Sequence, residues 1–223
     1  ILSRSSYRVF RLSKVKGKSA MNPFFTVYIP FHTYGYAIKA KDALRSLDAQ
    51  SFTSFETILI ANGTSFPSWM NEGDIYKSTG VFGRKIIGGE YHTLGAAANA
   101  AIALAKGNWI VRLDADDYLE SNALWHFVNT IEQHSDKPII GVQGHWDEDN
   151  PDKVMGAGLA IQTSLLQEVG GYNEEEPIND GESIVRKISN EVFGTATSKW
   201  GLVRTEKPIY NYERHEGSMS CPS

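Results

Sequence analysis

A short apolar segment that runs directly into three carboxylates constrains this chain more than any other feature. Residues 109–113 are bulky or β-branched and predict a buried strand, and Asp114, Asp116 and Asp117 follow without a spacer. In an open α/β sheet, ligands bind at the carboxyl ends of the strands. Carboxylates this close repel one another unless a cation joins them, and their oxygens suit Mg²⁺ or Mn²⁺. The segment therefore predicts a metal–diphosphate site, the alternative being a solvated acidic turn before a helix that starts near Ser121.

Strand-like and helix-like segments alternate from Pro23 onward. Strands are predicted at 24–29, 55–61, 81–87, 109–113, 138–143, 154–161 and 199–204, with a short one at 74–77, and helices at 36–49, 91–106, 122–133, 164–169 and 178–188. The alternation is typical of an α/β fold with a mainly parallel central sheet flanked by helices. We expect Pro30 to close the first strand and Gly107 to end the alanine-rich helix as a left-handed cap.

The distribution of charge divides the chain into two parts. Residues 1–20 contain six Lys or Arg and no acid, although the whole chain has a net charge of -4. We therefore expect a flexible basic extension at 1–22 and a single domain at 23–223. The extension is predicted to be a solvated tail, with weak peripheral contact to an anionic membrane as the alternative.

Composition excludes several classes of protein. The acidic balance disfavours a nucleic-acid partner, which usually requires a basic surplus. One cysteine, Cys221, permits no intrachain disulfide, and no apolar run is long enough to cross a bilayer. The expected location is the cytoplasm, with the inner face of the membrane as an option through the basic extension.

Polar residues beyond the acidic segment supply further candidates. Asn62 follows the second strand in a turn, and Asn99 is the one polar residue in the small-residue part of its helix, where it faces either ligand or solvent. Asn179 and Glu182 have the spacing of a helix capping box, which leaves Asp180 without a structural explanation. A carboxylate at a helix start is stabilised as the anion, and Asp180 is therefore a candidate proton acceptor.

The ordered set of motifs resembles the family-2 glycosyltransferases. The matching segments are Val27 to Pro30, Ile60 to Ser65, Leu94 to Asn99, Ala105 to Gly107, Leu113 to Asp117, Val169 to Glu174, Asn179 to Asp180 and Tyr212 to Ser220. Each motif is only moderately specific, and their order carries the resemblance. The resemblance implies a nucleotide-diphosphosugar transferase fold, called GT-A. It also implies an inverting, metal-dependent transfer of a sugar from a nucleotide-diphosphate donor to a hydroxyl of a glycan, lipid-linked or other acceptor.

The resemblance also implies roles for individual residues. Pro30 and the loop through His32 would line the nucleoside pocket, with Asn62 nearby, and Asp114 would face the ribose and base of the donor. Asp116 would bind Mn²⁺ or Mg²⁺, and Asp117 would support the turn or the sugar. Asp180 aligns with the catalytic base and His215 with a residue that approaches the metal, whereas His215 considered alone is more typical of a loop histidine.

Two positions depart from the family pattern and keep alternatives open. Ala61 and Asn62 replace the acid that many relatives carry after the second strand, so the sequence does not specify the nucleotide. Asn179 replaces the acid before the base, which leaves Glu182 as a second candidate base. A catalytically silent sugar-nucleotide-binding module is therefore the alternative function. A phosphohydrolase with Asp114 as nucleophile ranks last, because it requires the aspartates on the first strand of the domain.

Overall fold

A computed structural model of the chain describes residues 22–67, 80–136, 139–144, 153–176, 181–194 and 201–213. The basic extension through residue 21, the strand predicted at 74–77 and the acidic segment 145–152 lie outside these ranges. Two of the proposed site residues, Asp180 and His215, also lie outside them. Within the described ranges no helix combines the length and the apolar character that crossing a membrane requires.

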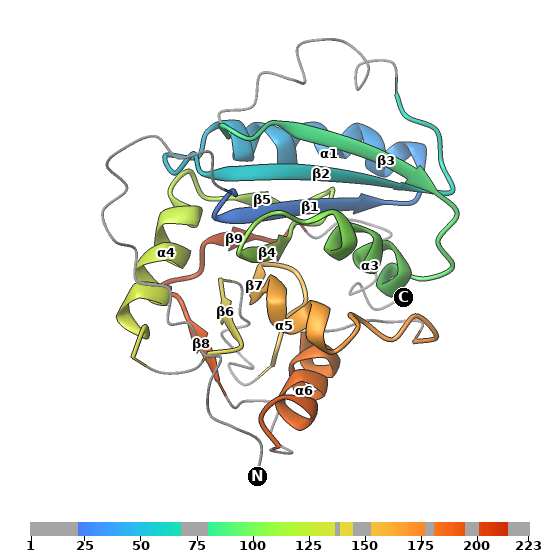
Figure 1. Cartoon of the computed structure of the whole chain (residues 1–223). Coiled ribbons are helices and arrows are strands. Elements are labelled where there is room, and N and C mark those ends of the chain that lie inside the picture. Colours follow the sequence, from blue (N-terminus) through green and yellow to red (C-terminus); the bar gives the residue numbers. More distant parts are fainter. Residues whose placement is uncertain are drawn as a thin grey trace.

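A seven-stranded sheet forms the centre of the molecule (Figure 1). Its strands are β1 (Phe25–Phe31), β2 (Phe55–Asn62), β3 (Arg84–Gly89), β4 (Trp109–Arg112), β6 (Gly141–Gln143), β7 (Leu159–Gln162) and β8 (Leu202–Arg204), in the spatial order β3-β2-β1-β4-β7-β6-β8. Strand β7 runs antiparallel to both of its neighbours, and the other pairs are parallel. The predicted α/β fold with a mainly parallel sheet is confirmed.

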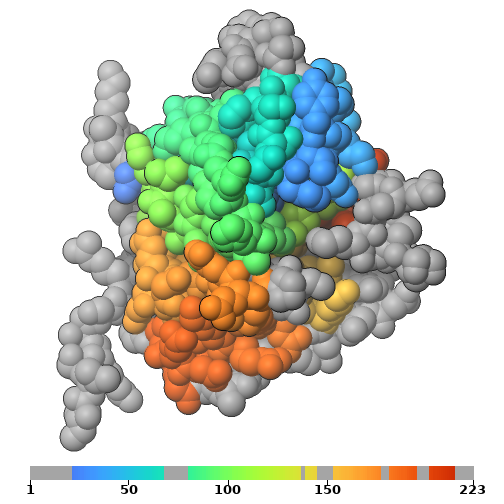
Figure 2. Space-filling model, turned by 90° about the vertical axis from the view of Figure 1, so that its right-hand side faces the viewer, coloured from blue at the N-terminus to red at the C-terminus, as the bar shows by residue number. Residues whose placement is uncertain are grey.

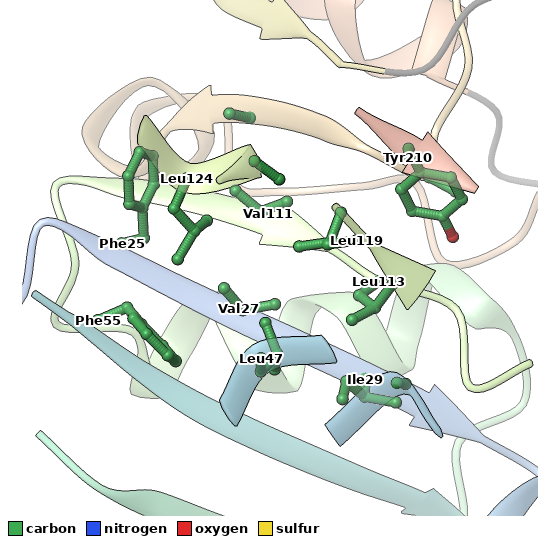
Figure 3. Close-up of a cluster of buried hydrophobic side chains, with 14 of the residues drawn as sticks. Phe25, Val27, Ile29, Leu47, Phe55, Val111, Leu113, Leu119, Leu124 and Tyr210 are labelled. Atoms are coloured by element: carbon green, nitrogen blue, oxygen red, sulfur yellow. The ribbon is translucent and has the colours of Figure 1, made fainter. Parts of the chain in front are cut away.

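Five helices within the described ranges cover the two faces of this sheet. They are α1 (Tyr34–Asp48), α3 (Leu94–Leu104), α4 (Ala123–Gln133), α5 (Thr163–Glu168) and α6 (Gly181–Glu191). One apolar cluster joins α1 and α4 to the face that carries Val27 and Ile29 (Figure 3), and a second joins α3, α5 and α6 to the face that carries Tyr28. Successive residues of a strand point to opposite faces, and β1 therefore contributes to both clusters.

The first strand continues one residue beyond the proline that we expected to end it. Pro30 is in register with Ile60, and Phe31 with Ala61. The pairing of β1 with β4 ends at Tyr28, so Pro30 has a paired neighbour on one side only. A missing N–H is tolerated where a strand has an unpaired side. Helix α1 then begins two residues earlier than predicted, because the Thr33 hydroxyl accepts a hydrogen bond from the Tyr36 N–H at 3.3 Å.

The prediction that Gly107 caps α3 in a left-handed conformation is wrong. Helix α3 ends at Leu104, the capping residue Ala105 that follows is extended, and Gly107 is not among the glycines with positive φ. A Cβ at Gly107 would lie 2.3 Å from the Thr26 nitrogen and 2.5 Å from the Phe25 carbonyl carbon. The glycine is required because the chain passes against the backbone of β1 at this point, a long-range contact that local sequence does not reveal.

Strands β5 (Tyr118–Leu119) and β9 (Tyr210–Asn211) form a small antiparallel sheet that sequence did not predict. Leu119 pairs with Tyr210, so the chain near residue 210 lies beside the turn after β4. Two-residue strands are too short to show a period of alternation, which is the signal on which strand prediction depends. This small sheet delivers a distant segment of the chain to the acidic turn.

Gly107→Ala is expected to destabilise the fold by about 1 to 3 kcal/mol, because the new methyl group overlaps backbone atoms that have little freedom to move. Urea denaturation followed by circular dichroism measures the change. Gly35→Ala is the matched control, since the nearest atom to its Cβ is 3.7 Å away. We expect it to be neutral or stabilising by up to about 1 kcal/mol. Equal effects of the two substitutions would contradict the close approach of Gly107 to β1.

Candidate active site

Asp114, in the turn that follows β4, is oriented by an ion pair with Arg112, the last residue of that strand. The Arg112 guanidinium donates two hydrogen bonds to the carboxylate, Nε to Oδ1 at 2.5 Å and Nη2 to Oδ2 at 2.8 Å. The two side chains are only 12% and 23% exposed. Burial alone would lower the pKa of Arg112, but the charge and hydrogen bonds of Asp114 outweigh it and raise that pKa. The pair therefore holds one carboxylate in a fixed direction at the carboxyl end of a central strand.

Asp117 points into the protein. It is 1% exposed, and its Oδ2 accepts a hydrogen bond from the Tyr210 hydroxyl at 2.5 Å while its Oδ1 accepts one from the Glu213 N–H at 2.9 Å. Burial raises the pKa of the Asp117 carboxyl to about 7, although both hydrogen bonds act to lower it. These contacts favour support of the turn over contact with a sugar, the two roles that sequence left open.

Tyr210 bridges the two ends of the acidic turn. Its hydroxyl oxygen accepts a hydrogen bond from the Asp114 N–H at 3.1 Å and donates to Asp117. Its ring is 4% exposed and belongs to the apolar cluster beneath the turn, as Figure 3 shows. Sequence reasoning assigned no role to Tyr210, because nothing local indicates that a residue 93 positions after Asp117 contacts it.

Asp116 is the remaining acid of the turn, and its side chain is partly exposed. Burial raises the pKa of the Tyr36 phenol of α1, and the negative charge of Asp116 raises it further. No cluster of three or more metal-ligating side chains occurs in the ranges that the structure describes. Mg²⁺ commonly takes one or two carboxylates and completes its shell with water and substrate phosphates. Asp116 fits that kind of open site rather than a closed protein cage.

Aromatic and cationic side chains lie at the mouth of the site, after β1. The exposed ring of His32 is 5.0 Å from the ring of Tyr36, with their planes tilted by 34°. The Lys39 ammonium lies 5.4 Å from the centre of the Tyr36 ring. Pro30 is partly buried at the end of the same strand. Planar rings at the carboxyl edge of a sheet provide surfaces on which a nucleobase stacks.

Asn62 holds the end of β2 to the segment that leads into α3. Its side-chain oxygen accepts a hydrogen bond from the Tyr91 N–H at 2.8 Å, and the Gly63 N–H donates to the Gly89 carbonyl at 2.8 Å. The amide thus braces the loops at this edge of the sheet. Its partly exposed side chain keeps it at the border of the site.

The side chain of Asn99 is hydrogen-bonded to another segment of the protein. Its Oδ1 accepts from the Tyr172 N–H at 2.8 Å, and its Nδ2 donates to the Tyr172 carbonyl at 3.0 Å and to Glu174 Oε1 at 2.8 Å. These three bonds attach α3 to the segment after α5. From sequence, Asn99 was expected to face either a ligand or solvent. The structure instead shows a protein partner 73 residues away.

Of the two candidate bases, the structure describes Glu182. It lies in the first turn of α6 and pairs with Arg186 one turn later, with Oε1 and Nη2 2.6 Å apart. Both side chains are partly exposed, as in an ordinary helix-surface ion pair. Asp180 directly precedes the first residue of this helix.

The seven-stranded, mainly parallel sheet flanked by helices matches the GT-A fold of solved glycosyltransferases. The profile of glycosyl transferase family 2 matches residues 26–193, and the chain belongs to that family. An uncharacterised protein of Sinorhizobium fredii, y4gI, is 26% identical in an alignment 197 residues long that covers 80% of this chain and 22% of that protein.

Solved glycosyltransferase structures share the fold. S. aureus TarS 1-349 in complex with UDP-GlcNAc superimposes with a TM-score of 0.67 at 16% identity, over 87% of this chain and 59% of TarS 1-349. The mannosyltransferase PcManGT from Pyrobaculum calidifontis, in complex with GDP-Man and Mn²⁺, gives a TM-score of 0.64 at 17% identity, over 85% of this chain and 56% of PcManGT. The chain thus spans less than two thirds of each of these proteins.

Tyr210→Phe is expected to destabilise the fold by about 1 to 3 kcal/mol, because it leaves the buried Asp117 carboxylate and the Asp114 N–H each without one partner. Denaturant unfolding measures the loss. Tyr118→Phe serves as the control, since Tyr118 belongs to the same small sheet but is 41% exposed. Its effect should lie within about 0.5 kcal/mol of zero. A Tyr210→Phe protein as stable as the Tyr118→Phe protein would show that the bridge contributes nothing.

Proposed function

We propose that this chain catalyses an inverting transfer of a sugar from a nucleotide-diphosphate sugar to a hydroxyl of an acceptor, which is a glycan, a lipid-linked molecule or another hydroxyl compound. The observation that carries the proposal is the acidic turn after β4, where Arg112 orients Asp114 and the inward-facing Asp117 leaves Asp116 as the carboxylate for a cation. Relatives with this fold are solved with UDP-GlcNAc and with GDP-Man, which supports a donor of this class.

The donor is proposed to lie across the carboxyl ends of β1 and β4. The rings of His32 and Tyr36 would flank the base, with Pro30 below them and Asn62 at the border of the pocket. Asp114 would accept hydrogen bonds from the hydroxyl or N–H groups of the nucleoside. Because Arg112 already fixes its direction, little conformational entropy remains to be lost when the donor binds.

A divalent cation, Mn²⁺ or Mg²⁺, completes the proposed site. Asp116 would hold it, with His215 as the second candidate ligand that the family implies. When bound, such an ion supplies Lewis acidity to the diphosphate leaving group. The protein's own contribution is to hold Asp116 on a turn whose two ends are fixed by Tyr210.

Asp180 is proposed as the general base. A base on the acceptor side accepts the proton of the attacking hydroxyl as the bond from the sugar to the diphosphate breaks, and a single displacement inverts the anomeric carbon. Glu182 is the less suitable candidate, because Arg186 already engages its carboxylate in an ordinary ion pair on the helix surface. A silent nucleotide-sugar-binding module remains the second candidate, since Asn62 replaces the acid of many relatives and its oxygen already accepts from Tyr91.

Asp116→Asn is expected to lower sugar transfer by about 100-fold or more, since removing a metal ligand forfeits several kcal/mol of stabilisation of the leaving diphosphate. Release of nucleotide diphosphate from a panel of UDP-, GDP-, dTDP- and CDP-sugars with Mn²⁺ measures the effect. Asp42→Asn is the control, because Asp42 is an exposed acid of α1 paired with Arg45. If Asp116→Asn kept the same metal-dependent turnover as the unmodified protein, Asp116 would not be the metal ligand.

Asp180→Asn is expected to lower kcat by about 10²- to 10⁴-fold, the usual contribution of a general base, while donor binding remains. Glu182→Gln should keep kcat within a few-fold and lose only a surface ion pair. Initial rates and calorimetric titration with the donor separate the two effects. A large loss of kcat in Glu182→Gln, with kcat nearly unchanged in Asp180→Asn, would assign the base to Glu182. Donor binding without transfer in the unmodified protein, across the acceptors tried, would favour the silent module.

A further inference from the structure

A sharp turn at residues 170–174 is attached to α3 by the side chain of Asn99. The amide both accepts from and donates to the backbone of Tyr172, at 2.8 and 3.0 Å, and it also donates to Glu174. The Thr93 hydroxyl at the start of α3 adds a bond to the Glu174 carbonyl at 2.9 Å. Helix α3 therefore holds the turn at Tyr172 and at Glu174, largely through the single side chain of Asn99.

The same turn is attached to α6 from the other side. The Lys187 ammonium donates to the Gly171 carbonyl at 2.9 Å. Gly171 has a φ of 75°, and a Cβ there would lie 2.2 Å from Asn99 Oδ1, so the turn and the amide fit closely. Figure 2 shows the green segment around α3 directly against the orange segment that contains this turn and α6. The turn thus lies between α3 and α6 and is bonded to both helices.

Tyr172 extends this connection to the acidic turn. Its side chain is 9% exposed, and its phenol shares a hydrogen bond with the buried phenol of Tyr28. Tyr28, Tyr172 and Arg112 line one small cavity beneath the sheet edge, and Arg112 is the partner of Asp114. Tyr172, which Asn99 holds, therefore lines the same cavity as Arg112, the partner of the carboxylate proposed to face the donor.

We propose that Asn99 is a positioning residue that sets the separation between Asp114 and the start of α6. This inference rests on the proposed function, in which Asp180, the residue immediately before α6, accepts the proton. Gly181 is itself tightly placed, since a Cβ there would lie 2.5 Å from the Met155 carbonyl oxygen. With α6 anchored at Gly181 and at Lys187, the turn held by Asn99 determines where the helix start lies relative to the donor acid.

The test compares kcat and donor KM for Asn99→Ala, with the nucleotide sugar that the unmodified protein turns over. Misplacement of a reacting group by about 1 Å costs on the order of 100-fold in rate, so we expect kcat to fall about 10- to 100-fold. Donor KM should change by less than about threefold, because the Asn99 amide is bonded to Tyr172 and Glu174 and is proposed to act on position rather than on donor binding. Thr163→Val is the matched control, since it removes a buried hydrogen bond of 2.7 Å to the Gly107 carbonyl, at the opposite edge of the sheet. Its kcat should be unchanged.

A compensating pair separates positioning from general loss of packing. Asn99→Asp places a carboxylate opposite Glu174, and the two charges repel. Asn99→Asp combined with Glu174→Gln restores a donor and an acceptor between residues 99 and 174, while the bond to the Tyr172 carbonyl is lost in both variants. We expect the double variant to recover kcat to at least about tenfold above Asn99→Asp, with Glu174→Gln alone close to the unmodified protein.

The outcomes distinguish this inference from the function on which it rests. Equal kcat in Asn99→Ala and Thr163→Val, in a protein that Asp180→Asn inactivates, overturns the positioning role alone. A rise in donor KM with kcat unchanged does so as well, because it places Asn99 in donor binding. Full activity of Asp180→Asn overturns the base assignment, and absence of transfer by the unmodified protein overturns both.

Discussion

The ion pair between Arg112 and Asp114 is the interaction on which the arrangement of this edge of the sheet depends. A guanidinium is costly to bury unless an anion compensates it, and here the compensating carboxylate is also the first acid of the functional turn. The strand places Arg112 opposite Tyr28 of β1, so the pair is fixed to the centre of the sheet. The same contact that makes the buried charge tolerable therefore fixes the direction of Asp114 at the edge where we propose that the donor binds.

The acids of the turn differ because tertiary contacts place them in different environments. Asp117 is enclosed by Tyr210 and the Glu213 N–H, which come from the far end of the described chain, and its carboxylate serves the structure. Asp116 stays partly exposed, and burial together with its negative charge raises the pKa of the Tyr36 phenol in α1. A run of similar residues thus separates into an oriented acceptor, a proposed metal ligand and a structural brace. The difference arises from burial and hydrogen bonding, since the residues themselves are chemically identical.

Much of the edge is held by amides whose partners are distant in sequence. Asn62 accepts from the N–H of Tyr91, and Asn99 binds the backbone of Tyr172. From sequence, Asn62 was expected in a turn at the edge of the sheet and Asn99 was expected to face either ligand or solvent. Their partners were not predictable, because an amide gives no local signal of which backbone group it will meet. The same limitation applied to Gly107, whose sequence position suggests a cap and whose actual neighbour is β1.

Sequence by itself determined the alternation of strands and helices, the mainly parallel sheet and the position of the acidic turn at the end of a buried strand. These features depend on periodicity and on short-range spacing, which a linear pattern records directly. Only the tertiary structure decided the direction of each carboxylate, the attachment of β9 by Tyr210 and the bracing of residues 171–174 by Asn99. Those contacts join residues 70 or more positions apart, and their geometry is set when separate elements pack together.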